Sequence, residues 1–406
     1  MQTRLAEFIK HTPEGEEADR ILRACVHCGF CTATCPTYQL LGDELDGPRG
    51  RIYQIKLVLE GEAATATTQL HLDRCLTCRN CETTCPSGVQ YGRLLDIGRE
   101  VVSEQVKRSP MQTAIRWSLR KLLTTQGLFA PALGIGRMMR PMLPEVLKKK
   151  IPPAQETPQV PESVLDRKMI VAAGCVQPTY KPATNASLSR VLHRLGIESV
   201  TVNEERCCGA VSFHLDAHDE AKGLMRANID AWWPHIESGA EAIISSASGC
   251  GVMIKDYARV LADDPVYSAK AMRVTELAKD VVEVIETEDL SAIEIVHPRR
   301  VAFQSPCTLQ HGQKLAGRVE AVLERAGYRL MPVADPHFCC GSAGTYSVLQ
   351  KDLSLQLRQR KIESLEEAQP NIIATANIGC HLHLEEATKI PVKHWIELLD
   401  DPALPL

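Results

Sequence analysis

Residues 25–36 read Cys-Val-His-Cys-Gly-Phe-Cys-Thr-Ala-Thr-Cys-Pro, and residues 75–86 read Cys-Leu-Thr-Cys-Arg-Asn-Cys-Glu-Thr-Thr-Cys-Pro. Both blocks have the spacing C-x2-C-x2-C-x3-C-P. We know of no common structural reason for this spacing to occur twice in one chain. The repeated pattern therefore indicates bound metal that organises the fold of this part of the chain.

The spacing is the one by which bacterial ferredoxins hold [4Fe-4S] clusters. In two-cluster ferredoxins the first three cysteines of a block bind one cluster and the fourth binds the other. We therefore predict two [4Fe-4S] clusters whose fourth ligands are exchanged between the blocks. The predicted ligands are Cys25, Cys28, Cys31 and Cys85 for the first cluster, and Cys75, Cys78, Cys81 and Cys35 for the second.

Zinc is the alternative metal for these blocks, because zinc held by four cysteines also favours paired CxxC elements. Structural zinc sites usually join two such elements across a longer spacer. Each block here packs four cysteines and a proline into a dozen residues. This compactness favours iron-sulfur clusters over zinc.

The composition is that of a large globular protein from a reducing compartment. The 406 residues predict two or three domains. A hydrophobic content of 44% provides cores that need no disulfides, so metal ligation explains the 16 cysteines better than bridges do. A net charge of -4 and a pI near 6.4 argue against a general nucleic-acid binder.

The sequence shows no export signal and no membrane-spanning segment. Arg4, Glu7 and Lys10 interrupt what would be the apolar core of a signal peptide. No uncharged apolar run reaches the roughly 18 residues that a spanning helix needs. We expect a cytoplasmic protein, and peripheral attachment to the inner face of the membrane stays open.

The first 165 residues predict two regions. Residues 1–105 read as an α-helical two-cluster ferredoxin-type domain, with helices expected over 18–24, 48–60 and 94–102 from their apolar spacing. Residues 106–165 read as a basic and apolar helical connector that ends in a proline-rich linker. Such a basic amphipathic segment can lie on an anionic membrane, on a partner subunit or on the protein's own core. The linker prolines are Pro152, Pro153, Pro158 and Pro161.

From residue 166 the chain repeats one plan twice, over residues 166–290 and 291–406. A buried strand runs into Cys175, and Cys-Cys-Gly follows at 207–209. A second strand runs into Cys307, and Cys-Cys-Gly follows at 339–341. The separation is 32 residues in both copies (207 − 175 and 339 − 307). Each interval contains an amphipathic helix closed by a glycine, Gly196 or Gly327.

The later halves of the two copies also match, since residues 242–250 and 372–380 are both strands that run into a cysteine. Alternating strands and helices of these lengths predict an α/β domain with a mainly parallel sheet. Ligands of such sheets bind outside the carboxyl ends of the strands. The thiols gathered there are Cys175, Cys207, Cys208 and Cys250 in the first repeat, and Cys307, Cys339, Cys340 and Cys380 in the second.

Two sets of four matched thiols predict one or two further metal or redox centres, because thiolates are the preferred ligands of soft metals. Iron-sulfur is the first choice, with zinc or a dithiol pair as alternatives. A glycine after two cysteines suits a tight loop, since glycine tolerates positive φ. His311, His381 and His383 could approach the second set, and His27 could tune the first cluster. No complete dinucleotide fingerprint or P-loop is present, so we expect no bound flavin, nicotinamide or ATP.

Taken together, the two cysteine blocks and the two Cys...CysCysGly...Cys repeats resemble the heterodisulfide reductase-like family of iron-sulfur subunits. This family includes the subunits of glycolate oxidase, anaerobic glycerol-3-phosphate dehydrogenase and lactate-utilisation complexes. The resemblance is nearest to the glycolate oxidase branch. It rests on residues 23–38, on Gly-Asp-Glu-Leu-Asp-Gly-Pro-Arg-Gly-Arg at 42–51, and on Cys-Cys-Gly-Ser-Ala-Gly-Thr-Tyr at 339–346.

The resemblance implies an electron-transfer subunit of a multi-subunit glycolate, or 2-hydroxy-acid, dehydrogenase. Such a subunit passes electrons from flavin-containing subunits to a quinone or another membrane acceptor, and does not itself oxidise the substrate. In family members with heterodisulfide reductase activity, each repeat ends in CxxC and holds an unusual cluster through five cysteines. Here Ala247 and Asn377 replace the earlier cysteine of that pair, which leaves a conventional cluster or another centre open.

Two other functions remain alternatives at this point. The repeat sites could themselves be catalytic, in a complex that reduces a disulfide or a quinone, although no catalytic residue is identified. A zinc-stabilised scaffold for complex assembly would need no redox activity.

Overall fold

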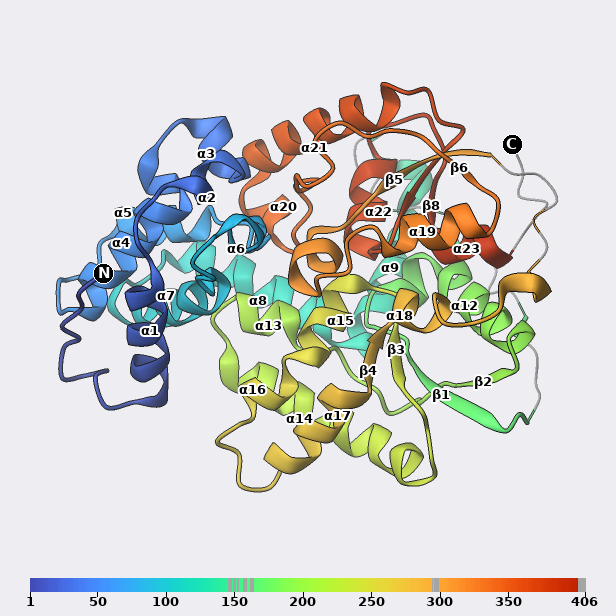
Figure 1. Cartoon of the computed structure of the whole chain (residues 1–406), viewed down its shortest axis with the longest axis horizontal. Coiled ribbons are helices and arrows are strands. Elements are labelled where there is room, and N and C mark those ends of the chain that lie inside the picture. Colours follow the sequence, from blue (N-terminus) through green and yellow to red (C-terminus); the bar gives the residue numbers. More distant parts are fainter. Residues whose placement is uncertain are drawn as a thin grey trace. The chain divides into compact units, whose positions relative to one another are not determined.

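The computed structural model describes residues 1–144, 148, 151, 153–155, 159–160, 164–293, 295 and 299–400 (Figure 1). The chain forms two compact units. The first contains Met1–Arg116 and His337–Lys361, and the second contains Trp117–Pro336 and the segment from Ile362 onward. Two of the three boundaries fall within helices α8 (Pro110–Thr124) and α21 (Lys351–Glu366), and the third lies in the turn at Pro336 and His337.

The domain limits at residues 105, 165 and 290 stay predictions. Within the predicted linker, Pro152, Pro158 and Pro161 lie outside the described residues.

The first unit is helical, and its helices over residues 1–105 confirm the predicted class of this region. Thr12 caps α1 by accepting a hydrogen bond from Gly15 N at 3.0 Å, and Pro13 begins the helix. The helices predicted over 18–24, 48–60 and 94–102 are confirmed as α1, α4 and α7. The elements of residues 1–105 are α1 (Pro13–Ala24), α2 (Phe30–Ala33), α3 (Pro36–Leu41), η1 (Glu44–Asp46), α4 (Pro48–Leu59), α5 (Ala66–Asp73), α6 (Asn80–Thr84) and α7 (Tyr91–Gln105), and the later segment adds α20 (Tyr346–Leu349).

The core of the first unit lies where α1, α4 and α7 meet. Leu22, Ile55 and Leu94, one from each helix, are fully buried there. Gly98 on α7 permits the close approach of α4, because a Cβ at Gly98 would lie 2.6 Å from Ile55 Cγ1. The loops that carry the two cysteine blocks are therefore supported by one helical core.

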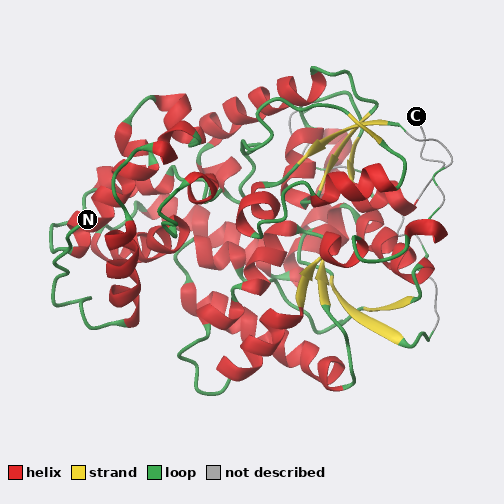
Figure 2. Cartoon of the chain, in the orientation of Figure 1, coloured by secondary structure: helices red, strands yellow, loops and turns green. Residues whose placement is uncertain are grey.

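The second unit contains two separate four-stranded sheets, which appear as two groups of arrows in Figure 2. All pairings are parallel, and both sheets have the same order, β2-β1-β3-β4 and β6-β5-β7-β8. The prediction of parallel sheets in two matched repeats is therefore confirmed. The strands are β1 (Arg167–Ala172), β2 (Ile197–Val200), β3 (Ile243–Ser245), β4 (Ala278–Asp280), β5 (Arg300–Gln304), β6 (Arg329–Leu330), β7 (Ile372–Thr375) and β8 (Val392–His394).

The two sheets share one hydrophobic core. Helix α12 (Pro182–Arg194) of the first repeat packs against α23 (Trp395–Asp400) of the second, and α18 (Val281–Ile285) of the first packs against α19 (Arg318–Arg325) of the second. In each pair, one helix follows the first strand of its repeat and the other follows the last. The repeats thus exchange equivalent helix contacts within the second unit.

The remaining elements of the second unit cover the sheets or connect them. They are α9 (Gln126–Met139), η2 (Arg140–Met142), α11 (Gln177–Tyr180), α13 (Ala210–His214), α14 (His218–Glu237), α15 (Ser248–Lys255), α16 (Tyr257–Val260), α17 (Ser268–Leu277), η3 (Leu290–Ala292), the π-helix η4 (Thr308–Gly312) and α22 (Ile378–Glu385). Among the described residues, no helix has the length and apolarity to cross a bilayer.

Candidate metal centres

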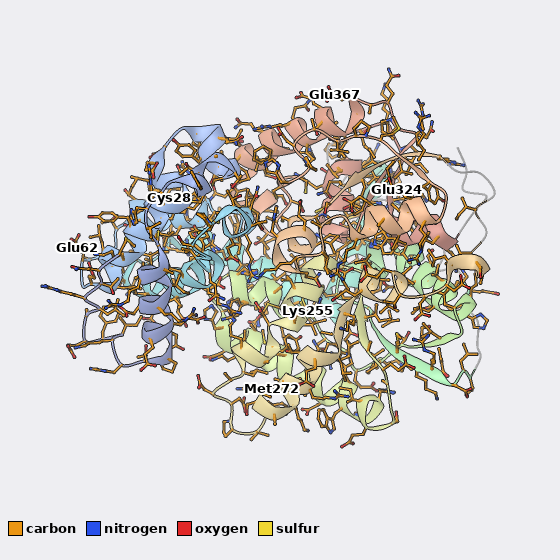
Figure 3. The ribbon with its side chains drawn as sticks, viewed as in Figure 1. Cys28, Glu62, Lys255, Met272, Glu324 and Glu367 are labelled. Carbon is orange, nitrogen blue, oxygen red and sulfur yellow. The ribbon has the colours of Figure 1, made fainter. Side chains whose placement is uncertain are left out.

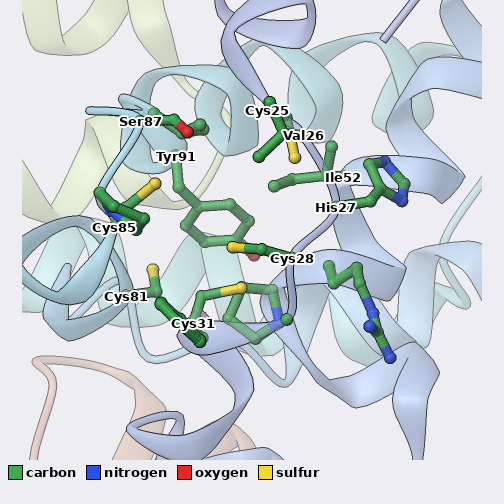
Figure 4. A pocket seen from close by; sticks show the side chains of 16 residues that line it. Cys25, Val26, His27, Cys28, Cys31, Ile52, Cys81, Cys85, Ser87 and Tyr91 are labelled. Atoms are coloured by element: carbon green, nitrogen blue, oxygen red, sulfur yellow. The ribbon is translucent and has the colours of Figure 1, made fainter.

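The first pocket lies beside the loop that follows α1, and it has about 430 Å³ of empty space. Figure 4 shows sulfur atoms of both cysteine blocks around the Tyr91 ring. Cys28 is exposed, and its side chain is labelled in Figure 3. The cysteines that line this pocket are Cys25, Cys28, Cys31, Cys81 and Cys85.

The second pocket has about 300 Å³ of empty space, lies in the same unit, and is lined by four buried cysteines. Arg51 and Tyr91 contribute to its wall, and both side chains are buried. Its lining cysteines are Cys35, Cys75, Cys78 and Cys81.

The cysteines of each predicted set influence one another. Burial raises the pKa of Cys31 to about 11, and the neighbouring thiols that add to this effect are Cys25, Cys85 and Cys28. Burial also raises the pKa of Cys81, where the contributing thiols are Cys78, Cys75 and Cys35. The thiols of each predicted set are therefore close enough to interact electrostatically, and the ligand sets stay a prediction.

The two cysteine loops have the same unusual backbone. His27 and Thr77 have φ angles of 55° and 53°, and two positions later Gly29 and Arg79 have φ angles of 84° and 58°. Left-handed backbone is costly for residues other than glycine and persists where the surroundings impose it. Both short loops therefore bend around their pockets in the same way. Such a bend suits a loop whose cysteines bind one compact inorganic group.

Polar groups approach the sulfur atoms of the second pocket. Tyr91 Oη donates to Cys75 Sγ at 3.6 Å, and Thr77 N donates to the same sulfur at 3.4 Å. Cys35 Sγ lies 3.3 Å from Thr37 Oγ1. Donors placed around sulfur suit thiolate ligands, because hydrogen bonds stabilise their negative charge. The residues present therefore fit a thiolate-bound cluster.

The first repeat brings its four predicted cysteines together. Cys175 follows β1, Cys207 and Cys208 lie in the loop before α13, and Cys250 lies on α15. Hydrogen bonds from the thiols of Cys175 and Cys208 lower the pKa of Cys207. Cys208 also interacts with Cys250, so the four sulfur atoms form a continuous cluster.

Glu205 is a buried residue of this region that the sequence did not indicate. Its carboxylate oxygens accept hydrogen bonds from Gly174 N at 3.1 Å and Ala173 N at 3.2 Å. Burial raises its pKa to about 7, against the opposing effect of these two bonds. An acidic residue two positions before Cys-Cys-Gly was the available signal.

The glycine of each Cys-Cys-Gly has a steric role. Gly209 and Gly341 have φ angles of 92° and 88°. A Cβ would lie 3.2 Å from Ala221 O at Gly209, and 2.5 Å from Ser354 O at Gly341. Positive φ was expected for these tight loops, and the group that approaches each glycine is a helix carbonyl.

The cysteines of the second repeat are divided between the compact units. Cys339 and Cys340 belong to the first unit, and Cys307 and Cys380 belong to the second. Asn377 begins α22 and donates from Nδ2 to Cys380 Sγ at 3.6 Å. The predicted four-thiol set of this repeat stays a prediction.

Three of the four histidines named from the sequence are buried, and His27 is half-buried. His311, His381 and His383 are buried in the second unit, while His27 lines the first pocket. Burial lowers the pKa of His27 and of His381. Their predicted roles near metal stay predictions.

Comparison with known protein families finds matches in three parts of the chain. Residues 21–89 match a 4Fe-4S dicluster domain. Residues 170–255 and 301–385 each match a cysteine-rich domain named after the Cys-Cys-Gly motif. The chain therefore contains an iron-sulfur dicluster region followed by two cysteine-rich repeats.

A solved structure shares the fold at low sequence identity. A hypothetical protein from Helicobacter pylori superposes with a TM-score of 0.55 and 9% identity, covering 94% of this chain and 71% of that one.

Curated relatives are similar over nearly the whole chain. The glycolate oxidase iron-sulfur subunit of Escherichia coli is 53% identical over 402 residues, which are 98% of each protein. A probable glycolate oxidase iron-sulfur subunit of Bacillus subtilis is 31% identical, covering 93% of this chain and 90% of that protein. Lactate utilization protein A of Exiguobacterium is 28% identical over 56% of this chain and 94% of its own length. The identity and coverage of the first two relatives show that this chain belongs to the family of glycolate oxidase iron-sulfur subunits.

Proposed function

We propose that this chain carries electrons from flavin-containing subunits that oxidise glycolate to a quinone or another membrane acceptor. The observation that carries this proposal is the pair of pockets lined by cysteines from both blocks. Iron-sulfur clusters supply one-electron transfer when bound at such sites. The protein's own residues bind and orient the clusters, while hydride chemistry belongs to the partner's flavin.

The ligand assignment that we propose for the two [4Fe-4S] clusters of this ferredoxin-like region exchanges the fourth cysteine. Cys85 joins the first three cysteines of the first block, and Cys35 joins those of the second. The grouping of the thiols supports this assignment. The first set is Cys25, Cys28, Cys31 and Cys85, and the second is Cys75, Cys78, Cys81 and Cys35.

We propose a further metal centre in the first repeat, held by Cys175, Cys207, Cys208 and Cys250. Their mutual interactions support a shared ligand. Iron-sulfur is the first choice and zinc the second. In the second repeat, Cys307, Cys339, Cys340 and Cys380 remain the set predicted from the sequence.

Anaerobic purification of the full chain tests the function. Iron and sulfide analysis with EPR during reductive titration should show at least two [4Fe-4S] centres. The chain alone should not oxidise glycolate. Stoichiometric zinc without reducible iron would favour the scaffold, and glycolate turnover by the chain alone would contradict the subunit role. Turnover of a disulfide or quinone by the reduced chain would favour a catalytic role for the repeats.

Paired alanine variants test the exchanged ligands. Cys28→Ala with Cys85→Ala removes two ligands of one cluster, so the iron of only one cluster should be lost. Cys28→Ala with Cys35→Ala removes a ligand from each cluster, so both should be affected. The reverse pattern would show that each block binds its own cluster.

We also propose that helix α9 and the η2 turn contact the surface of an anionic membrane. Leu128, Ile135, Met138 and Met142 are exposed along this segment, at 52%, 60%, 83% and 85%. Apolar residues with nearby arginines suit an interfacial helix.

The protein should float with vesicles of anionic lipid, and Met138→Ser with Met142→Ser should weaken this binding. Equal flotation of the wild type and the double variant would overturn the proposal.

A further inference from the structure

Two arginines that lie two positions apart in α4 reach different cluster pockets. Arg49 lines the first pocket, and Arg51 lines the second. The Arg49 side chain is 39% exposed and pairs with Glu44, whose side chain is 40% exposed. The Arg51 side chain is 0% exposed. Water therefore screens the charge of Arg49, while the charge of Arg51 acts inside the protein.

Three hydrogen-bonding groups hold Arg51 in place. Its Nε donates to His71 O at 2.8 Å, its Nη1 donates to Thr37 Oγ1 at 3.1 Å, and its Nη2 donates to Asp46 Oδ1 at 3.3 Å. Thr37 Oγ1 in turn lies 3.3 Å from Cys35 Sγ. Arg51 is thus one hydroxyl group away from a proposed ligand of the second cluster.

Basic side chains surround the carboxylate of Asp46. Arg74 Nη1 donates to Asp46 Oδ2 at 2.9 Å, and His71 Nδ1 lies 3.0 Å from Asp46 Oδ1. Asp43, Asp46 and His71 lie close enough to hold a metal ion, but the two arginines already neutralise the Asp46 carboxylate. Two arginines against one carboxylate leave excess positive charge beside the second pocket.

The local sequence brings these charges together through Gly50. A Cβ at Gly50 would lie 2.1 Å from Glu44 O. Only glycine therefore lets the turn η1, which carries Asp46, approach α4, which carries Arg51. Asp43 Oδ1 caps this turn by accepting from Leu45 N at 2.9 Å. The arrangement is built into the stretch from Asp43 to Arg51.

We propose that Arg51 raises the reduction potential of the cluster bound by Cys35, Cys75, Cys78 and Cys81, and that the negative charge of Asp46 opposes this effect. This inference rests on the proposed function, because it requires a cluster in the second pocket. One-electron reduction of a cluster by an external reductant adds one negative charge there. A buried cation stabilises that charge, so it favours the reduced form.

The test is an EPR-monitored redox titration of the full-length chain, with the second cluster identified by loss of its signal in Cys78→Ala. Arg51→Gln should shift the midpoint potential of this cluster to a lower value, and Asp46→Asn should shift it to a higher one. The opposite signs matter, because mere loss of structure would not produce them. Arg49→Gln is the matched control and should leave the second cluster's potential unchanged.

The outcomes separate the tuning role from the proposed function. A wild-type protein without two reducible clusters contradicts the function. Two normal wild-type clusters with unshifted potentials in both variants overturn only the role of Arg51, and so do shifts of the same sign. If Arg51→Gln fails to retain the cluster, Asp46→Asn decides: a raised potential supports the proposal, and an unchanged or lowered one overturns it.

Discussion

At the scale of single residues, Asp280 is a buried carboxyl group whose protonation depends on its surroundings. Asp280 ends β4 and caps α18, where its Oδ1 accepts from Val282 N at 3.2 Å and its Oδ2 accepts from Gln313 Nε2 at 3.0 Å. Burial raises its pKa to about 7, and the charges that face it are Lys255 and Glu283. The folded protein therefore keeps a proton on Asp280 at pH values where the unfolded chain has lost it.

This proton gives a pH dependence of stability with a definite sign. The stabilisation linked to Asp280 is complete below about pH 4 and is lost as the pH rises through about 7. Asp280→Asn should remove this loss, which is on the order of 2–4 kcal/mol between pH 4 and 8. Denaturant unfolding of both proteins across this range is the measurement. Parallel curves for the wild type and the variant would contradict the prediction.

Asp289→Asn is a control of opposite sign. Asp289 is exposed, and the backbone and hydroxyl of Ser291 lower its pKa through hydrogen bonds. The stabilisation of the folded protein by ionised Asp289 is present at neutral pH and disappears in acid. This variant should therefore leave the decline towards pH 8 in place.

The sequence could predict the cysteines of the site, but not the charges behind them. Ligand spacing is a local property, so the pattern alone indicated these cysteines as ligands; the exchange of Cys85 and Cys35 between the blocks rests on the likeness to two-cluster ferredoxins and stays a prediction. Arg51 lies in the stretch 42–51 that carried the family resemblance, but the sequence indicated no role for it. Its burial depends on the close approach of η1 that Gly50 allows. Glu205 escaped notice for the same reason, since the backbone groups that it binds lie 31 and 32 residues away.

At the scale of elements, apolar periodicity was a reliable guide where helices are long and have one buried face. Helices α1, α4 and α7 follow it, as do strands β1 and β5, which end three residues before Cys175 and Cys307. The π-helix η4 after Cys307 could not be predicted, because five ordinary residues adopt it only in this tertiary setting.

The Cys-Cys-Gly loop of the second repeat gives an element-scale prediction. Gly341→Ala should destabilise the first unit by about 2–4 kcal/mol, from left-handed backbone together with the clash with Ser354 O. Gly344→Ala is the matched control: φ there is 61°, but the space around the Cβ is open, so about 1 kcal/mol is expected. Thermal or denaturant unfolding measures both. Equal losses would show that the contact with α21 is unimportant.

At the scale of the whole molecule, the first unit is discontinuous. Residues 337–361 complete it, and Phe338, Tyr346 and Leu357 are buried. Tyr346 Oη donates to Arg74 O at 3.1 Å, and Asn80 Nδ2 donates to His337 O at 3.2 Å. The equality of the two repeats in the sequence gave no sign that one Cys-Cys-Gly loop would belong with the cysteine blocks, because that assignment depends on contacts across more than 250 residues.

A fragment of residues 1–116 should therefore hold iron less stably than the full chain. A fusion of residues 1–116 to residues 337–361 through a flexible linker should recover much of this stability, since it restores the contacts between the two segments. Iron retention during anaerobic chelator challenge and resistance to protease are the measurements. Equal retention by the bare fragment and the full chain would contradict the prediction.

The discontinuity also sets an order of events during synthesis. The ribosome must add 220 residues (336 − 116) after the first segment before synthesis of residues 337–361 begins. At about 5–20 residues per second, this takes about 10–45 s. During that interval the eight thiols of the two blocks have been made, but the segment that bonds to Arg74 and Asn80 at the second block has not. The nascent chain therefore has a window in which assembly factors can deliver clusters, and in which oxidants can reach the same sulfur atoms.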